Sequence, residues 1–227
     1  MEIGIGIITY KGHTRVAQLV ESILRRDPGV DRKRLGILIY DDGTPSGIPA
    51  STWDLKPRVR SAGFTGFHAA SSILNRGIAP SWNAITRLAF EAGARIMVLL
   101  NDDILVCDRW LEAMIYFLDN NPHAGTASWL QFFFDPPDAP MILADPDKAT
   151  PRTPLRKPGQ ALRDAQPRWS VGEAKPGRVG CPAGSAFAFT RTMWDRTPGF
   201  PDAFRSFHEE ASWSWELVQQ GFPAYSL

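Results

Sequence analysis

Cysteine is scarce in this sequence, and it has neither a long apolar run nor a strong net charge. The two cysteines, Cys107 and Cys181, cannot build a disulfide framework or a cysteine-based zinc site. Free cysteines favour a reducing, cytoplasmic location. No apolar stretch reaches the roughly 18 residues that a membrane helix needs, so we expect no integral membrane segment. A net charge of +1 argues against nucleic acid as a partner.

What the sequence does contain is an alternation of short apolar runs and amphipathic segments. The runs at residues 3–8, 35–40 and 96–100 have the length and character of strands that are buried on both faces. Residues 16–24 repeat apolar side chains at helical spacing. Strands that alternate with helices predict an α/β fold with a mostly parallel, Rossmann-like central sheet flanked by helices.

Helix starts are predicted from capping residues. Thr14, Ser81 and Asp108 each stand at the start of an amphipathic segment and could accept a backbone N–H there. A last helix is predicted over residues 209–220, with Gly221 as its stop signal.

Residues 135–178 differ in composition from the rest of the chain. They are rich in proline and basic residues and poor in aliphatic ones, so they cannot form much core of their own. Long segments of this kind inside a domain are usually lids, binding loops or disordered. We therefore predict one domain over residues 1–227, in which residues 1–134 form one half, 135–178 an irregular basic loop, and 179–227 the other half.

The most informative motif is Asn101-Asp102-Asp103, which follows directly on the buried run at residues 96–100. Two adjacent carboxylates repel each other unless a positive group lies between them. Mg²⁺ or Mn²⁺ carrying phosphates is the usual partner, because these ions take few protein carboxylates and complete their shell with phosphate oxygens and water. The alternative interpretation is an aspartate pair that only caps the next turn.

Two further polar clusters end predicted strands. Thr9-Tyr10 ends the first, and Asp41-Asp42-Gly43 ends the second. In open α/β sheets, ligands bind in the crevice beyond the carboxyl ends of the parallel strands. The order of elements therefore predicts that these clusters and the aspartate pair converge. A plain turn remains the alternative for residues 41–43.

With these motifs the chain resembles the inverting family 2 glycosyltransferases of the GT-A fold. The likeness covers about residues 3–134 and 180–225 and depends on an ordered set of motifs, each of which is weak alone. These are Ile7-Ile8-Thr9-Tyr10, Tyr40-Asp41-Asp42-Gly43-Thr44, Asn75-Arg76-Gly77 with Asn83, Leu99-Leu100-Asn101-Asp102-Asp103, Pro182-Ala183-Gly184-Ser185, Gly199-Phe200-Pro201-Asp202 and Glu209-Glu210.

The resemblance implies a role for each motif residue. It implies that residues 1–134 form the half of the domain that binds the nucleotide sugar. Residues 179–227 then form the half that binds the acceptor and carries the catalytic base. The implied donor-binding residues are Thr9, Tyr10, Asp42, Asn83 and Asp102, with Asp42 reading the base of a UDP- or dTDP-sugar. Asp103 is implied as the ligand of Mn²⁺ or Mg²⁺, and Asp102 as a contact of the ribose or the metal. Glu210 falls at the position of the catalytic base, with Glu209 as the alternative.

This implied reaction has a simple physical logic. A bound cation neutralises the leaving diphosphate, and a carboxylate deprotonates the acceptor hydroxyl as it attacks. One base on the face opposite the leaving group gives inversion. The acceptor could be a saccharide, a lipid-linked sugar or a protein. Trp213 or Trp215 could stack on a sugar, although either could instead be a core residue.

Two departures from the family pattern keep other functions open. Asn101 stands where many relatives have an aspartate, and Glu210 replaces the more usual aspartate base. A binding module that has lost turnover is therefore one alternative. A sugar-phosphate nucleotidyltransferase is another, but that class needs a glycine-rich phosphate loop near its start. Gly4 and Gly6 instead lie within the first apolar run, which argues against it.

Overall fold

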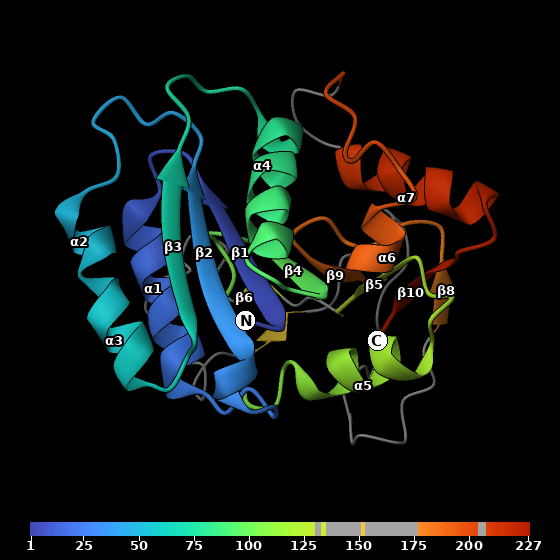
Figure 1. Ribbon diagram of the computed structural model, residues 1–227, viewed down its shortest axis with the longest axis horizontal. Helices are drawn as coiled ribbons and strands as arrows, with labels where there is room; N and C mark the ends of the chain where they lie inside the picture. Colours follow the sequence, from blue (N-terminus) through green and yellow to red (C-terminus); the bar gives the residue numbers. More distant parts are fainter. Residues whose placement is uncertain (130–132, 135–150, 153–176, 204–207) are drawn as a thin grey trace.

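The apolar runs predicted as strands form the centre of an eight-stranded mixed sheet. A computed structural model describes residues 1–129, 133–134, 151–152, 177–203 and 208–227. The predicted basic loop lies almost entirely outside these residues. In spatial order the strands are β3 (Gly66–Ser71), β2 (Leu35–Asp41), β1 (Ile3–Thr9), β4 (Ile96–Asn101), β9 (Ala186–Thr190), β5 (Thr126–Ser128), β10 (Ala224–Ser226) and β8 (Gly177–Val179) (Figure 1).

The first four strands of this order run parallel to one another, as predicted. β1 pairs in register with β2 from Ile3 opposite Leu35 to Thr9 opposite Asp41. On its other side β1 pairs with β4, where Ile8 lies opposite Asn101. The polar residues that follow β1, β2 and β4 are therefore delivered to one edge of the sheet. Beyond β4 the sheet is mixed, because β9 is antiparallel to both β4 and β5.

Helices cover both faces of the sheet. One face packs against α1 (His13–Arg25), α3 (Leu55–Ser61) and α5 (Glu112–Asn120), and the other against α4 (Ile78–Glu91), α6 (Arg191–Trp194) and α7 (Glu209–Gln219). In Figure 1, α4 crosses in front of β1 and β2. The remaining described elements are α2 (Ala50–Trp53), a 3-10 turn at Arg32–Arg34, and the small pair β6 (Phe133–Phe134) with β7 (Pro151–Arg152). Among the described residues, no helix is long and apolar enough to cross a membrane.

Two glycines in β1 allow α4 to lie close to the sheet. A Cβ on Gly4 would lie 2.9 Å from the Ala89 Cβ of α4, and a Cβ on Gly6 would overlap Met97 and approach Ile85. Close packing of this kind leaves no room for a methyl group without a shift of the neighbours. Gly4 and Gly6 are thus interior strand residues, as their sequence context predicted.

The predicted helix starts are wrong at three positions. The first helix begins at His13 with Gly12 as its N-cap, one residue before Thr14. Ser81 lies inside α4, where its hydroxyl donates to the carbonyl of Gly77 instead of capping. Asp108 accepts from the backbone N–H of Asp27, and α5 starts four residues later. For Ser81 an intrahelical partner, and for Asp108 a tertiary partner, takes the side chain that would have capped the helix.

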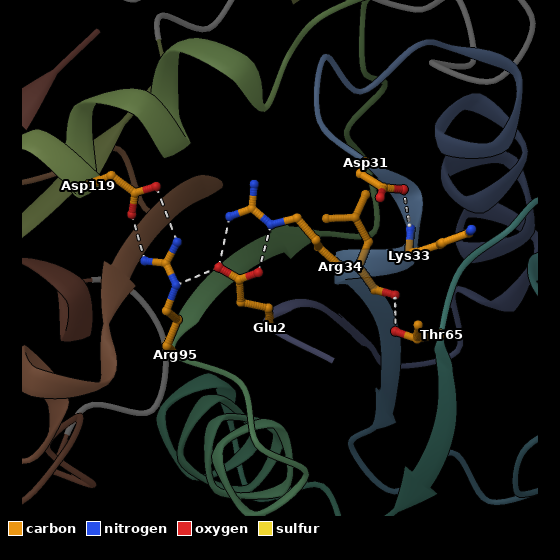
Figure 2. Close-up of polar contacts among 8 residues, drawn as sticks. Glu2, Asp31, Lys33, Arg34, Thr65, Arg95 and Asp119 are labelled. Carbon is orange, nitrogen blue, oxygen red and sulfur yellow. Dashed lines mark hydrogen bonds and ion pairs between the residues drawn. The ribbon is translucent and has the colours of Figure 1, made fainter.

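Four charged side chains form an ion-pair network at the amino ends of the central strands (Figure 2). The Glu2 carboxylate accepts from both Nε (2.6 Å) and Nη2 (2.8 Å) of Arg34, and also from Nε of Arg95 (2.6 Å). Arg95 continues to Asp119 with bonds of 2.6 and 3.1 Å. The hydrogen bond from Arg34 in particular, and also that from Arg95, lower the pKa of Glu2 from 4.5 to about 2.

This network predicts how stability depends on pH. Because the pKa of Glu2 is lower in the folded protein, its contribution is complete above pH 4.5 and is lost as the pH falls towards about 2. We expect Glu2→Gln to lower the free energy of unfolding by about 1 kcal/mol at neutral pH, since the network is partly exposed. The difference from wild type should shrink in urea titrations across that pH range. Glu91→Gln, on the exposed end of α4, is the control, and a pH-independent difference would contradict the assignment.

Candidate functional site

An open cleft of about 450 Å³ lies at the carboxyl edge of the parallel strands. Its walls come from the ends of β1, β2 and β4, from the first turn of α1 and from the segment that leads into α4. Five of the seven site residues predicted from sequence lie here, while Asn83 and Glu210 are not part of its lining. The lining residues are Ile8, Thr9, Tyr10, Arg15, Asp42, Asn75, Gly77, Ile78, Asn101, Asp102 and Asp103.

Asp102 is held by two groups from the β1–α1 junction. The Thr9 hydroxyl donates to its Oδ2 at 2.6 Å. Arg15 donates from Nε to Oδ1 at 2.9 Å and from Nη2 to Oδ2 at 3.0 Å, a bidentate pair. The Thr9 hydroxyl in turn accepts the backbone N–H of Gly12 at 3.1 Å. Sequence reasoning missed Arg15, although its place in the first turn after a strand-end cluster was an available signal.

Asp103 lies in a different environment from its neighbour. Its side chain is exposed, and it makes no side-chain hydrogen bond or ion pair with another described residue. Partial desolvation by the surrounding protein raises the pKa of Asp103, and the adjacent Asp102 carboxylate raises it further. A carboxylate in this position gains from a nearby cation.

The described residues fit a lightly coordinated divalent cation. Among them, no group of three or more His, Cys, Asp and Glu side chains could enclose a metal ion. Mg²⁺ and Mn²⁺ sites of the phosphate-carrying type need one or two carboxylates, and the rest of the shell comes from phosphate and water oxygens. Asp103, with its unengaged oxygens at the cleft, is suited to that kind of site.

Asp42 organises the segment between β3 and α4. Its buried carboxylate accepts the backbone N–H of Arg76 and the backbone N–H of Gly77, both at 2.9 Å. The Ser72 hydroxyl lies 3.3 Å from the same side chain. An ionised carboxylate has about four lone-pair directions, so one remains for a donor in the cleft.

Asp41 lies behind this wall and is fully buried. It accepts the Thr44 hydroxyl at 2.6 Å, and its second oxygen lies 3.4 Å from Nε2 of His13. The other ring nitrogen of His13 lies 3.1 Å from the Thr52 hydroxyl. His13 therefore lies between Asp41 and Thr52 beneath the wall of the cleft, and the sequence did not reveal these partners.

Asn83, one of the predicted donor residues, lies outside the lining of the cleft. The side chain is buried in α4, its amide nitrogen donates to the carbonyl of Phe200 at 2.8 Å, and its amide oxygen accepts the Phe200 N–H at 2.8 Å. Both ends of the amide are thus used in joining α4 to the turn before α7. The geometry makes Asn83 a structural residue rather than part of the cleft wall.

Glu210 reaches the neighbourhood of the cleft from the other half of the protein. It is half-buried in the first turn of α7 and lies against Gly184, where a Cβ would be 2.8 Å from its Cδ. The next residue, Ser185, accepts the backbone N–H of Asn101 at 2.9 Å. One short segment therefore connects the aspartate motif with Glu210.

The two tryptophans of α7 differ in exposure. Trp213 is fully buried and packs against Phe189 and Phe200, so it is a core residue and cannot stack on a ligand. Trp215 is 59% exposed and is available for contact.

These features define a class: an α/β protein whose ligand cleft lies at the carboxyl edge of a parallel half-sheet. The sequence model of the family described as glycosyl transferase family 2 matches residues 5–165, well over half of the chain. The chain therefore belongs to glycosyl transferase family 2. This finding confirms the resemblance seen in the sequence motifs.

Solved structures share the same GT-A fold. The mannosyltransferase PcManGT from Pyrobaculum calidifontis, in complex with GDP-Man and Mn²⁺, is 16% identical with a TM-score of 0.67. TarS from S. aureus is 12% identical with a TM-score of 0.64, and TarS 1–349 in complex with UDP-GlcNAc has a TM-score of 0.60. The comparisons cover 100% of this chain but 54%, 35% and 56% of those chains, respectively. A search of curated proteins finds no match.

The close packing around Gly12 predicts the effect of one methyl group. Its φ of −105° suits alanine, but a Cβ there would overlap Asp102 and Arg15 and lie 2.7 Å from the Thr9 hydroxyl. We expect Gly12→Ala to break one or two of these hydrogen bonds and to lower the free energy of unfolding by about 1–2 kcal/mol. Urea titration measures the change. In Gly177→Ala the new methyl meets nothing within 4 Å, so an equal loss in both variants would contradict the argument.

Proposed function

We propose that this protein transfers a sugar from a nucleoside diphosphate sugar to an acceptor hydroxyl, with inversion at the anomeric carbon. The observation that carries the proposal is the convergence of Thr9, Asp42, Asp102 and Asp103 in one cleft of a family 2 member. Solved structures of the same fold were obtained with GDP-Man and with UDP-GlcNAc, which supports a donor of this class. This chain spans only about half the length of those two proteins. The proposal for its activity therefore depends on the residues of this chain.

The donor's nucleoside is proposed to bind at the β1 and β2 ends of the cleft. Asp42 keeps one lone-pair direction free, and an imide N–H of uracil or thymine is a matching donor. Tyr10 is 41% exposed beside Thr9 and offers an aromatic face to the same region. UDP- and dTDP-sugars are therefore the favoured donors.

The donor's diphosphate is proposed to lie near Asp103, which would hold Mn²⁺ or Mg²⁺. When bound, the cation acts as a Lewis acid that stabilises the leaving diphosphate. The exposed, partly desolvated carboxylate is the feature of this chain that supports the role.

Glu210 is the proposed base. A half-buried carboxylate within hydrogen-bond reach of an acceptor hydroxyl can take its proton during attack. Glu210 comes from α7, whereas the donor residues come from β1, β2 and β4, so the two groups approach from different halves. Trp215, exposed on the same helix, is the proposed contact for a saccharide acceptor, which could be free, lipid-linked or attached to a protein.

The glycines of β1 weigh against a nucleotidyltransferase. Gly4 and Gly6 are covered by α4 and cannot form a phosphate loop. A nucleotide-sugar-binding module without turnover is the remaining alternative, and a measurement of turnover separates it from an enzyme.

The donor site predicts a metal-dependent thermal shift. We expect UDP or dTDP with Mn²⁺ to raise the melting temperature, because a ligand at 100 times its Kd stabilises by about 2.7 kcal/mol. The panel also contains GDP and CDP, each with and without Mn²⁺. Asp103→Ala should abolish the Mn²⁺-dependent part, whereas Asp54→Ala, at the exposed start of α3, should keep it. No shift with any nucleotide would reject the donor site.

The base assignment predicts a selective loss of turnover. Glu210→Gln should lower the rate of nucleoside diphosphate release in the presence of acceptor by about 10²–10⁴-fold. The thermal shift with donor should stay close to that of wild type, because the donor residues are untouched. Glu216→Gln, on the exposed face of the same helix, is the control. Near-normal turnover in Glu210→Gln would remove it from this role, and no turnover in wild type would favour the binding module.

A further inference from the structure

We infer that Arg15 is a positioning residue that neutralises Asp102 and reserves it for a neutral hydroxyl group of the donor, so that the divalent cation goes to Asp103. The inference depends on the proposed function, because it concerns how the same cleft divides its two aspartates. Arg15 belongs to none of the sequence motifs, so the sequence alone did not indicate a role for its side chain.

The contacts of Asp102 carry the first step. Its side chain is 11% exposed and accepts the two Arg15 donors and the Thr9 hydroxyl. Both Thr9 and Nη2 of Arg15 bind Oδ2, and Nε of Arg15 binds Oδ1. Three of about four lone-pair directions are thus occupied, and the remaining one lies on Oδ1. A hydroxyl group can use a single lone pair without changing this arrangement.

A divalent cation is poorly suited to the same oxygen. A guanidinium keeps its charge at all relevant pH values. A dication at metal-ligand distance from Oδ1 would stand close to the positive charge that already binds this carboxylate, and like charges at such distances repel strongly. Arg15 bonds directly to Asp102 and acts on Asp103 only through its charge at longer range, so a cation at Asp103 meets a weaker repulsion.

The position of Arg15 in the fold makes the arrangement persistent. Arg15 lies in the first turn of α1, and its neighbours Val16 and Leu19 are fully buried against the sheet. Gly12 leaves just enough space for Thr9, Asp102 and Arg15 to meet. The backbone of Arg15 is therefore fixed by the packing of α1, and the guanidinium is held by its two hydrogen bonds to Asp102.

Removing the guanidinium should convert the two aspartates into a stronger cation site. In Arg15→Met, Asp102 and Asp103 are adjacent carboxylates without a counter-ion, and such a pair favours a bound cation. We expect the affinity for Mn²⁺ alone, without nucleotide, to rise about tenfold, a modest value because the site is open to solvent. Electron paramagnetic resonance of free aqueous Mn²⁺ during titration measures this directly and needs no enzymatic activity.

Four companion variants separate charge from geometry. Arg15→Lys keeps the positive charge but loses the bidentate hydrogen bonding of the guanidinium. The affinity for Mn²⁺ should therefore stay at the wild-type value, whereas the thermal shift with donor should decrease. Arg15→Met combined with Asp102→Asn should return Mn²⁺ affinity to wild type. Arg25→Met, which removes an exposed charge at the far end of α1, is the control. If Arg15→Met does not fold, Arg15→Gln replaces it.

Unchanged Mn²⁺ affinity in the folded charge-removing variant would overturn the inference. So would an equal rise in Arg25→Met, which would indicate a general effect of net charge. Failure of the proposed function has a different signature: wild type would then show no nucleotide-dependent shift, whatever the Mn²⁺ titrations of the Arg15 variants show.

Discussion

The in-register parallel pairing of β1 with β2 and β4 is the constraint on which the cleft depends. It places Thr9 opposite Asp41 and Ile8 opposite Asn101, so that the polar residues after three separate strands emerge at one level. A slip of one residue would turn every side chain of a strand to the opposite face. It would turn Ile3, Ile5 and Ile7 towards the face where α4 packs closely on Gly4 and Gly6, and at the same time it would dismantle the cleft. Core packing and site geometry are therefore fixed by the same pairing.

Four carboxylates meet at this edge, and the protein stabilises three of them in three different ways. Asp41 is buried with the Thr44 hydroxyl and His13. Asp42 accepts backbone N–H groups, and Asp102 is paired with Arg15. Each of these partners belongs to the fold, and each lowers the cost of placing negative charge at the strand ends. Asp103 differs because the described residues give it no hydrogen-bonded or ion-paired partner, and for this reason it is the proposed position for an external cation.

The sequence predicted the strands and the convergence of their ends because both follow from local patterns. Apolar runs such as residues 96–100 must be buried, and their order along the chain determines which ends meet. The cap predicted at Asp108 was wrong because a capping residue can equally bind a distant group, and local sequence does not record which partner is nearer. Ser81 was wrong as a cap because its hydroxyl bonds to the carbonyl of Gly77 within the same helix, and α1 begins one residue before Thr14. Arg15 was missed for the same reason as the partner of Asp108, since its own partner is 87 positions away.

Asn83 shows how a residue can matter to a site without lining it. Its amide binds both backbone groups of Phe200, and the Phe200 ring lies 4.8 Å from that of Trp213, centroid to centroid. Trp213 is the buried anchor of α7, the helix that carries Glu210. α4, which packs on the donor-side strands, is thereby joined through one amide and two aromatic rings to the helix of the proposed base. The distance between the proposed donor site and the proposed base thus depends on packing in the core, in which the buried amide of Asn83 takes part.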